Sequence, residues 1–292
     1  MTLAGGPAHW QAVIAAYQAS RRLPTIVAGV LDGGELVWTG TAGGPTTVDT
    51  QYRVGSITKT MTAVLVLQLR DEGLLDLDDP LGRFIPESGY RDVALRELLS
   101  HTAGIHSEPA GPWWERSDGV EFDGLLAAND GASAVFGRGQ IYHYSNLGFA
   151  LLGEVVARLR GTPWWEVLTA RVLAPLDMAR TSYLPEEPAA QGLSVHHYAG
   201  TLTVEPATDT RAMAPAGQVW STVPDLAVFL RFLAEGHPEV LDRTTLREMA
   251  VAQRPAAEYG LGMRTGPVAG LQLVGHLGSM PGFQAVAVVD QD

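Results

Sequence analysis

A serine and a lysine lie three residues apart in the segment Ser56-Ile57-Thr58-Lys59. Residues at positions i and i+3 share one face of a helix, so the Lys59 amine can reach the Ser56 hydroxyl. A serine hydroxyl is a poor nucleophile until a base takes its proton. Lysine can be that base only when it is uncharged, and burial is the effect that lowers its pKa. We therefore predict that Ser56 is a catalytic nucleophile and that Lys59 activates it.

The segment Tyr144-Ser145-Asn146 could bring two more polar side chains to such a site. A buried tyrosine hydroxyl can relay a proton, and an asparagine amide can hold both a lysine and a substrate carbonyl. The same residues also have ordinary structural roles, Tyr144 as a core aromatic side chain and Asn146 as the cap of the helix that follows it. From these residues alone both interpretations are open.

The segment His276-Leu277-Gly278-Ser279 is the third candidate, at the end of a predicted strand. Gly278 would let a substrate approach the edge of the strand. The backbone N–H of Ser279 could then bind an oxyanion together with an N–H at the start of the Ser56 helix. The alternative is that His276 is a surface or half-buried strand residue without a chemical role.

Competing catalytic chemistries lack their motifs. The sequence contains no G-x-S-x-G, no H-E-x-x-H and no G-x-x-x-x-G-K-[ST]. It has no cysteine, which excludes disulfides, thiolate nucleophiles and zinc held by cysteine. His101 and His106 lie five residues apart and His196 and His197 are adjacent, but neither pair has a suitably spaced third ligand. We expect no metal and no cofactor.

Together and in this order, the three motifs resemble those of the penicillin-recognising serine hydrolases. That family includes serine β-lactamases, D-alanyl-D-alanine carboxypeptidases, D-aminopeptidases and β-lactamase-like esterases, and the Y-x-N form of the middle motif is typical of its class C branch. The resemblance covers nearly the whole chain and includes Leu98–Gly104 and Pro281–Phe283. It implies that Ser56 is acylated, that Lys59 and Tyr144 share the acid–base work, and that Asn146 positions them.

The resemblance also implies an oxyanion hole formed by the backbone N–H groups of Ser56 and Ser279, with Gly278 and His276 on the substrate-binding strand. His276 departs from the pattern, because many relatives have a lysine there that offers a cation to a substrate carboxylate. Histidine is mostly neutral at pH 7, and no glutamate can be identified as a class A deacylation base. We therefore expect weak or absent β-lactamase activity.

The function predicted from the sequence is that of an acyl-enzyme hydrolase for esters or D-amino-acid-containing amides. Two alternatives are open. A thioesterase or peptide cyclase of the same fold would use Ser56 but pass the acyl group to an amine. A non-catalytic sensor would use the same scaffold to bind a ligand.

The elements around these motifs predict an α+β fold. Apolar spacing predicts a helix at His9–Ser20 and another from Ser56 to about Glu72, which is apolar almost all round and so buried in the middle of the protein. Two β-rich runs, Thr25–Leu31 and Glu35–Thr41, are joined by Asp32-Gly33-Gly34 and predict a hairpin. Further helices are predicted at Val93–Leu99, Leu147–Arg160, Trp164–Val172, Pro224–Leu233 and Thr244–Ala250, and further strands at Gly260–Arg264, Leu271–His276 and Phe283–Asp290.

The two β-rich ends most simply join in one antiparallel sheet of a single β-lactamase/transpeptidase-like domain. Residues 1–75 and 240–292 would then form an α/β lobe and residues 76–239 a mostly helical lobe. The chain ends at Asp290-Gln291-Asp292, which has the look of a hairpin turn, so we expect a C-terminal truncation that removes a return strand. In the family that strand lies between the Phe283 strand and the N-terminal hairpin, and its loss should leave a gap with two unpaired edges.

The charge balance bears on partners and location. The formal net charge of −12 disfavours nucleic acids and anionic membrane surfaces. No signal peptide or apolar run long enough for a membrane span is present, which predicts a cytoplasmic protein that acts on a small-molecule or peptide acyl substrate. Trp113, Trp114 and Glu115 lie in a Gly/Pro-rich loop that could line the pocket or simply pack.

Overall fold

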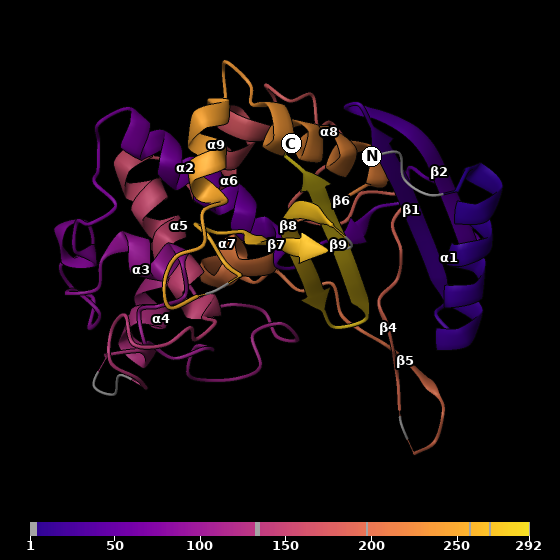
Figure 1. Cartoon of the computed structure of the whole chain (residues 1–292). Coiled ribbons are helices and arrows are strands. Elements are labelled where there is room, and N and C mark those ends of the chain that lie inside the picture. Colours follow the sequence, from indigo (N-terminus) through magenta and orange to yellow (C-terminus); the bar gives the residue numbers. More distant parts are fainter. Residues whose placement is uncertain (1–4, 132–134, 197, 257, 269, 292) are drawn as a thin grey trace.

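The helix that begins after Ser56 lies in the middle of the protein (Figure 1). This helix, α2 (Ile57–Asp71), is buried at every position from Ile57 to Leu69. The apolar residues on almost all of its faces predict this burial. It contacts the helices α5, α6 and α7 on one side and the strands β8 and β9 on the other. The structure is a computed structural model, and it describes residues 5–131, 135–196, 198–256, 258–268 and 270–291.

The longer strands form two separate antiparallel sheets. The predicted hairpin is confirmed as β1 (Thr25–Asp32) and β2 (Glu35–Gly43), and Gly33 and Gly34 take the positive φ values of 55° and 80° that its tight turn requires. The second sheet has the order β7 (Arg264–Val268), β8 (Leu271–Met280) and β9 (Phe283–Asp290).

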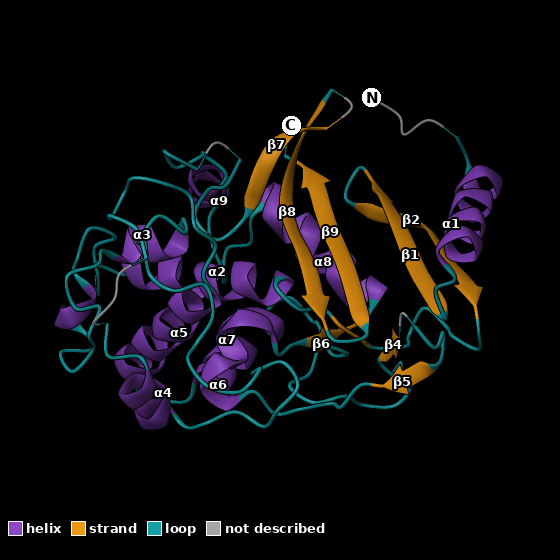
Figure 2. Ribbon diagram, turned by 90° about the horizontal axis from the view of Figure 1, so that it is seen from below, coloured by secondary structure: helices purple, strands orange, loops and turns teal. Residues whose placement is uncertain are grey.

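The expectation of one continuous sheet is wrong for the described residues. There β1 pairs with β2 and β9 pairs with β8, and no ladder joins β1 to β9. Figure 2 shows β1 as the next strand along from β9, so the two edges face each other without pairing. In the described residues the edges of β1 and β9 that face each other are therefore unpaired.

Most of the helices surround α2 on the side away from the sheets (Figures 1 and 2). In chain order, the helices after α2 are α3 (Leu95–Leu99), α4 (Phe122–Ala128), α5 (Asn146–Arg160), α6 (Trp164–Leu168) with the π-helical turn Thr169–Leu173, α7 (Ala214–Gly217), α8 (Val223–Glu235) and α9 (Arg243–Met249). Short strand pairs join β3 (Tyr52–Arg53) to β6 (Trp220–Ser221) and β4 (Leu193–Val195) to β5 (Leu202–Val204).

Two helices lie against the strands. The N-terminal helix α1 (Pro7–Arg21) covers β2, as the predicted amphipathic helix at this end of the chain would. Helix α8 packs on β1, β2 and β9, so it lies with the strands although the sequence boundary at residue 239 assigns it to the helical lobe. No helix in the described ranges is long and apolar enough to cross a membrane.

The strand predicted at Gly260–Arg264 is wrong, because β7 begins where that segment ends. The backbone of this segment bonds to two different neighbours: the Leu261 N–H donates to the carbonyl of Met249 and the Gly262 N–H to that of Leu99. Gly262 also has a φ of +77°, which a regular strand does not allow. The apolar composition of this segment is typical of a strand, but the residues form a loop that is hydrogen-bonded to α9 and α3.

Candidate active site

Ser56 stands at the N-terminus of α2, directly after a turn. Gly55 has a φ of +54°, a conformation that favours glycine, and it lets the chain reverse before the helix starts. Ser56 is the N-cap residue, but its side chain makes no capping hydrogen bond, and it is half-buried. Its hydroxyl is therefore free for another partner, and that partner is Lys59, whose Nζ lies 3.0 Å from Ser56 Oγ.

The amine of Lys59 is fully buried and has three oxygen neighbours. Besides Ser56 Oγ, these are Asn146 Oδ1 at 2.6 Å and the carbonyl oxygen of Ala216 at 2.6 Å. Both of the last two atoms can only accept hydrogen bonds. A neutral amine has two hydrogens and one lone pair, so the hydrogens go to Asn146 and Ala216 and the lone pair is left for Ser56. This is the geometry that a general base needs.

The electrostatics favour the neutral form of Lys59 at physiological pH. Burial lowers its pKa from the ordinary 10.5 to about 7, while the carboxylates of Glu108 and Glu115 oppose that change. Desolvation penalises the ammonium because the interior solvates charge poorly. The sequence predicts that burial activates Lys59, and the direction of this shift agrees with that prediction.

Tyr144 lies on the other side of the nucleophile. Its hydroxyl hydrogen-bonds with Ser56, and the Lys59 amine lies 5.1 Å from the centre of its ring. Burial raises the pKa of Tyr144 well above its usual range. The phenol therefore keeps its proton at neutral pH and is suited to donate or relay a proton rather than to act first as a phenolate base.

Asn146 is the first residue of α5, and the cap of that helix is its neighbour. Ser145 Oγ accepts the Gly148 N–H at 3.0 Å, so the alternative reading of Asn146 as the helix cap is wrong. The Asn146 side chain instead joins Lys59 to Glu108, because its Nδ2 donates to Glu108 Oε1 at 2.7 Å.

The strand β8 brings backbone atoms of Gly278 and Ser279 against the turn before α2. A Cβ on Gly278 would collide with the carbonyl oxygen of Val54 and would lie 3.4 Å from the backbone nitrogen of Ser56. A Cβ on Gly55 would lie 2.7 Å from the backbone nitrogen of Ser279. The backbone amides of Ser56 and Ser279 are thus neighbours, and only glycine permits so close an approach at position 278.

His276 lies behind this arrangement rather than at its surface. The residue is only 2% exposed. Its Nδ1 donates to the carbonyl of Leu277 at 2.6 Å, and its Nε2 accepts from the Tyr259 hydroxyl at 2.9 Å. Burial lowers the pKa of His276 to about 3, so the ring is neutral. No N–H of His276 is left for a substrate, and a direct substrate contact by this side chain does not fit the structure.

Several groups near the site are not singled out by the sequence. Glu108 binds Asn146 and also accepts the Trp114 indole N–H at 2.7 Å, while Ala216 contributes only a backbone carbonyl. His101 accepts the Ser145 N–H on its Nδ1 at 3.0 Å and stacks on Tyr144 with 4.1 Å between ring centres. None of these has a local sequence signal, apart from the position of His101 in a family-like stretch.

The two tryptophans of the loop that carries Trp113, Trp114 and Glu115 differ in burial and in their contacts with the site. Trp114 is 6% exposed and packs closely on Gly217. A Cβ added to Gly217 would lie 3.3 Å from the Trp114 ring. Trp113 is 55% exposed and its indole bonds to Glu115. Burial raises the pKa of Glu115. Of the two tryptophans, only Trp114 is tied to the site network.

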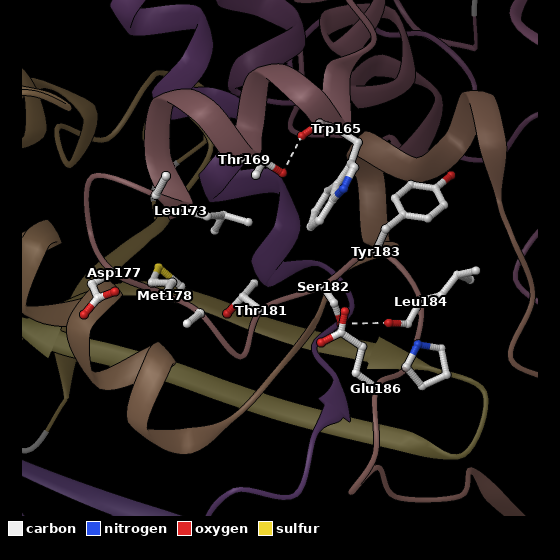
Figure 3. Close-up of a pocket in the computed structure, with 13 residues that line it drawn as sticks. Trp165, Thr169, Leu173, Asp177, Met178, Thr181, Ser182, Tyr183, Leu184 and Glu186 are labelled. Carbon is white, nitrogen blue, oxygen red and sulfur yellow. Dashed lines mark hydrogen bonds between the residues drawn. The ribbon is translucent and has the colours of Figure 1, made fainter.

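A separate pocket of about 650 Å³ lies between α6 and the segment 177–186 (Figure 3). Trp165, Leu173, Met178, Tyr183 and Glu186 are among its lining residues. None of the candidate catalytic side chains lines it. The pocket is therefore separate from the group of side chains around Ser56.

Comparison with known proteins agrees with the geometry. The model of the family described as Beta-lactamase matches residues 10–292. The chain is 31% identical to penicillin-binding protein 4 of Amycolatopsis lactamdurans over 77% of its own length and 63% of that protein, and 33% identical to esterase EstB of Burkholderia gladioli over 60% and 51%. The crystal structure of a D-stereospecific amidohydrolase from Streptomyces sp. is similar with a TM-score of 0.86 and 32% identity, over 99% of this chain and 92% of that one.

The chain thus spans between about a half and two thirds of the length of these two curated relatives. The match of the family model nevertheless runs through all three motifs, from before Ser56 to beyond Ser279. The α+β fold, with α1 and α8 packed on the strands and the other helices around α2, is similar to that of this solved structure. The protein belongs to the beta-lactamase family.

Proposed function

We propose that this protein is a serine hydrolase that cleaves esters or amides through an acyl-enzyme at Ser56. One observation carries the proposal: the two acceptors Asn146 Oδ1 and Ala216 O take both hydrogens of a neutral Lys59 amine, which directs its lone pair at Ser56 Oγ, 3.0 Å away. The pKa of about 7 for Lys59 makes that neutral form abundant at physiological pH.

In the proposed reaction, Lys59 takes the proton of Ser56 as Oγ bonds to the acyl carbon of the substrate. The carbonyl electron pair moves to oxygen, and the backbone N–H groups of Ser56 and Ser279 stabilise that oxyanion. When the oxyanion collapses, the bond to the leaving alcohol or amine breaks, and the leaving group receives a proton relayed by Tyr144 from Lys59. Water then attacks the acyl-enzyme by the same route, which returns Ser56 and releases the acid.

The surroundings of His276 support neutral acyl groups as substrates. Relatives with a lysine on this strand have a cation for a carboxylate, whereas His276 is buried, neutral and fully bonded. We expect esters and D-amino-acid amides to be better substrates than carboxylate-bearing β-lactams. The names of an esterase and of a D-stereospecific amidohydrolase among the similar proteins support this choice.

A fluorophosphonate probe tests the proposal without knowledge of the natural substrate. We expect the intact protein to be labelled at Ser56, as located by mass spectrometry, and Ser56→Ala to be unlabelled. Lys59→Ala should slow labelling by roughly a hundredfold or more, since general-base help is worth about 10²–10⁴. Ser20→Ala is the matched control, because that serine is exposed on α1 and lies outside the site.

Labelling that persists in Ser56→Ala, or that is equally fast in Lys59→Ala, would refute the proposal. No labelling of the intact protein would favour the sensor alternative over a hydrolase.

A further inference from the structure

Glu108 receives two hydrogen bonds in the site, one on each oxygen of its carboxylate. Asn146 Nδ2 donates to Oε1 at 2.7 Å, and Trp114 Nε1 donates to Oε2 at 2.7 Å. Both partners are obligate donors at these atoms. A carboxylate can serve both, but a glutamine has only one acceptor oxygen and would have to abandon one of them.

The segment that carries Glu108 is tied to the segment of the catalytic candidates. Ser145 Oγ donates to the carbonyl of His106 at 2.6 Å, Ser107 Oγ donates to the carbonyl of Tyr144 at 2.6 Å, and the Asn146 N–H donates to the carbonyl of Ser107 at 2.7 Å. These three bonds hold the two segments in one register. Glu108 is therefore held in place although it is an exposed residue.

The bond from Asn146 to Glu108 decides which way the Asn146 amide faces. A carboxylate oxygen can pair with the NH₂ end of an amide and repels its oxygen end. With Nδ2 directed at Glu108, Oδ1 must face Lys59. The reversed amide would direct two hydrogens at the Lys59 amine, and its lone pair would then bond to Asn146 instead of to Ser56.

We propose that Glu108 is a positioning residue of the active site, which orients the Asn146 amide so that the Lys59 lone pair faces Ser56. This inference rests on the proposed function. It assigns no contact between Glu108 and the substrate.

The charge of Glu108 has a second effect that must be separated from the first. The charged and titratable groups that face Lys59 are Glu108 and Glu115 from the loop, Tyr144, His101 and His276. The two carboxylates raise the pKa of Lys59. Glu115 is a matched control because its carboxylate accepts the Trp113 indole N–H and not a hydrogen of Asn146.

The test is the rate of fluorophosphonate labelling at Ser56 between pH 5 and 9 in Glu108→Gln and Glu115→Gln. Both variants remove a carboxylate that raises the pKa of Lys59. In both, the acidic limb of the plot of labelling rate against pH should therefore move to lower pH. We expect the plateau rate at high pH to fall roughly ten- to a hundredfold in Glu108→Gln alone, since misplaced catalytic groups cost up to about 10² in rate. In Glu115→Gln the plateau should stay within about twofold of the parent.

Glu108→Asp provides a second measurement should the glutamine variant fail to fold. It keeps the charge but is one methylene too short to reach both donors, so its plateau should fall while its acidic limb stays in place. Because glutamine could keep the Asn146 bond and lose only that of Trp114, Glu108→Leu, which offers Asn146 no acceptor, decides the case. An unchanged plateau in Glu108→Leu, or equal losses in the Glu108 and Glu115 variants, would overturn the positioning role while leaving Ser56 as the labelled residue. Absence of labelling in the parent protein would overturn the proposed function and this inference with it.

Discussion

The pH dependence of acylation is the sharpest consequence of the buried Lys59. With a pKa of about 7, half of the Lys59 amines are neutral at that pH, against about one in 3,000 for an ordinary pKa of 10.5. Burial thus increases the population of the active base roughly a thousandfold at pH 7. Below pH 7, the rate should fall about tenfold for each pH unit.

The assay is kcat/KM for a neutral aryl ester between pH 5 and 9, corrected for spontaneous hydrolysis, because this quantity reports the ionisation of the free enzyme. We expect an acidic limb with a midpoint near the Lys59 pKa of about 7 and a plateau above it. Lys59→Arg is the control, since a guanidinium keeps the charge but has no lone pair at these pH values. The Lys59→Arg variant should lose nearly all activity, and its kcat/KM should show no acidic limb.

Two results would refute the reasoning. A limb that is still rising at pH 9 would mean that Lys59 titrates like an exposed lysine and is not desolvated in the active form. A rate that does not change between pH 5 and 9 would mean that no base of this kind takes the proton of Ser56.

Three predictions concern the parts that support the site. Gly278→Ala should destabilise the protein by about 1–3 kcal/mol in urea unfolding, because its Cβ would collide with the Val54 carbonyl, and should slow labelling of Ser56. Ser145→Ala should cost about 1–2 kcal/mol in thermal or urea unfolding, because α5 loses its cap. His276 should make the fold acid-sensitive: its folded-state pKa of about 3 lies below the ordinary 6.5, so protons bind the unfolded chain first and stability falls as the pH drops from 6.5 toward 3. The loss from this residue should be about 2 kcal/mol at pH 5, and His276→Gln should be less sensitive to acid.

Each of these predictions has a control and a contrary outcome. Gly6→Ala is the control for Gly278, because nothing lies within 4 Å of the added Cβ, and equal stability of the two variants would contradict the close approach. Ser279→Ala, exposed on β8, is the control for Ser145, and equal unfolding midpoints for the two would contradict the cap. If His276→Gln loses as much stability between pH 7 and 5 as the parent protein, the buried neutral histidine is not the cause.

Local pattern was sufficient for the central part of the site. Ser56 and Lys59 are three residues apart on one helix, so helical geometry alone brings them together, and the distance of 3.0 Å agrees. The same holds for the hairpin of β1 and β2, where Gly33 and Gly34 dictate the turn, and for the buried character of α2. These features depend on neighbours within a few residues, which is the range over which a sequence pattern carries information.

The sequence patterns gave wrong predictions where the backbone forms hydrogen bonds with residues far away in the sequence. The apolar segment at Gly260–Arg264 forms a loop because Met249 and Leu99 take its N–H groups. The strands β1 and β9 do not join one sheet. The order of the motifs predicted which residues gather at Ser56, but it could not place the His276 ring behind the site, where Tyr259 and the Leu277 carbonyl take both nitrogens.

The sequence by itself therefore determined the pairing of Ser56 with Lys59, the α+β class and the resemblance that names the family. Only the tertiary structure decided how the Lys59 amine is oriented, because the atoms that orient it come from far along the chain: Asn146 is 87 residues from Lys59 and Ala216 is 157. Glu108 is 38 residues from Asn146 and has no motif of its own. Hydrogen-bond direction depends on the positions of all these groups at once, and no spacing along one segment encodes it.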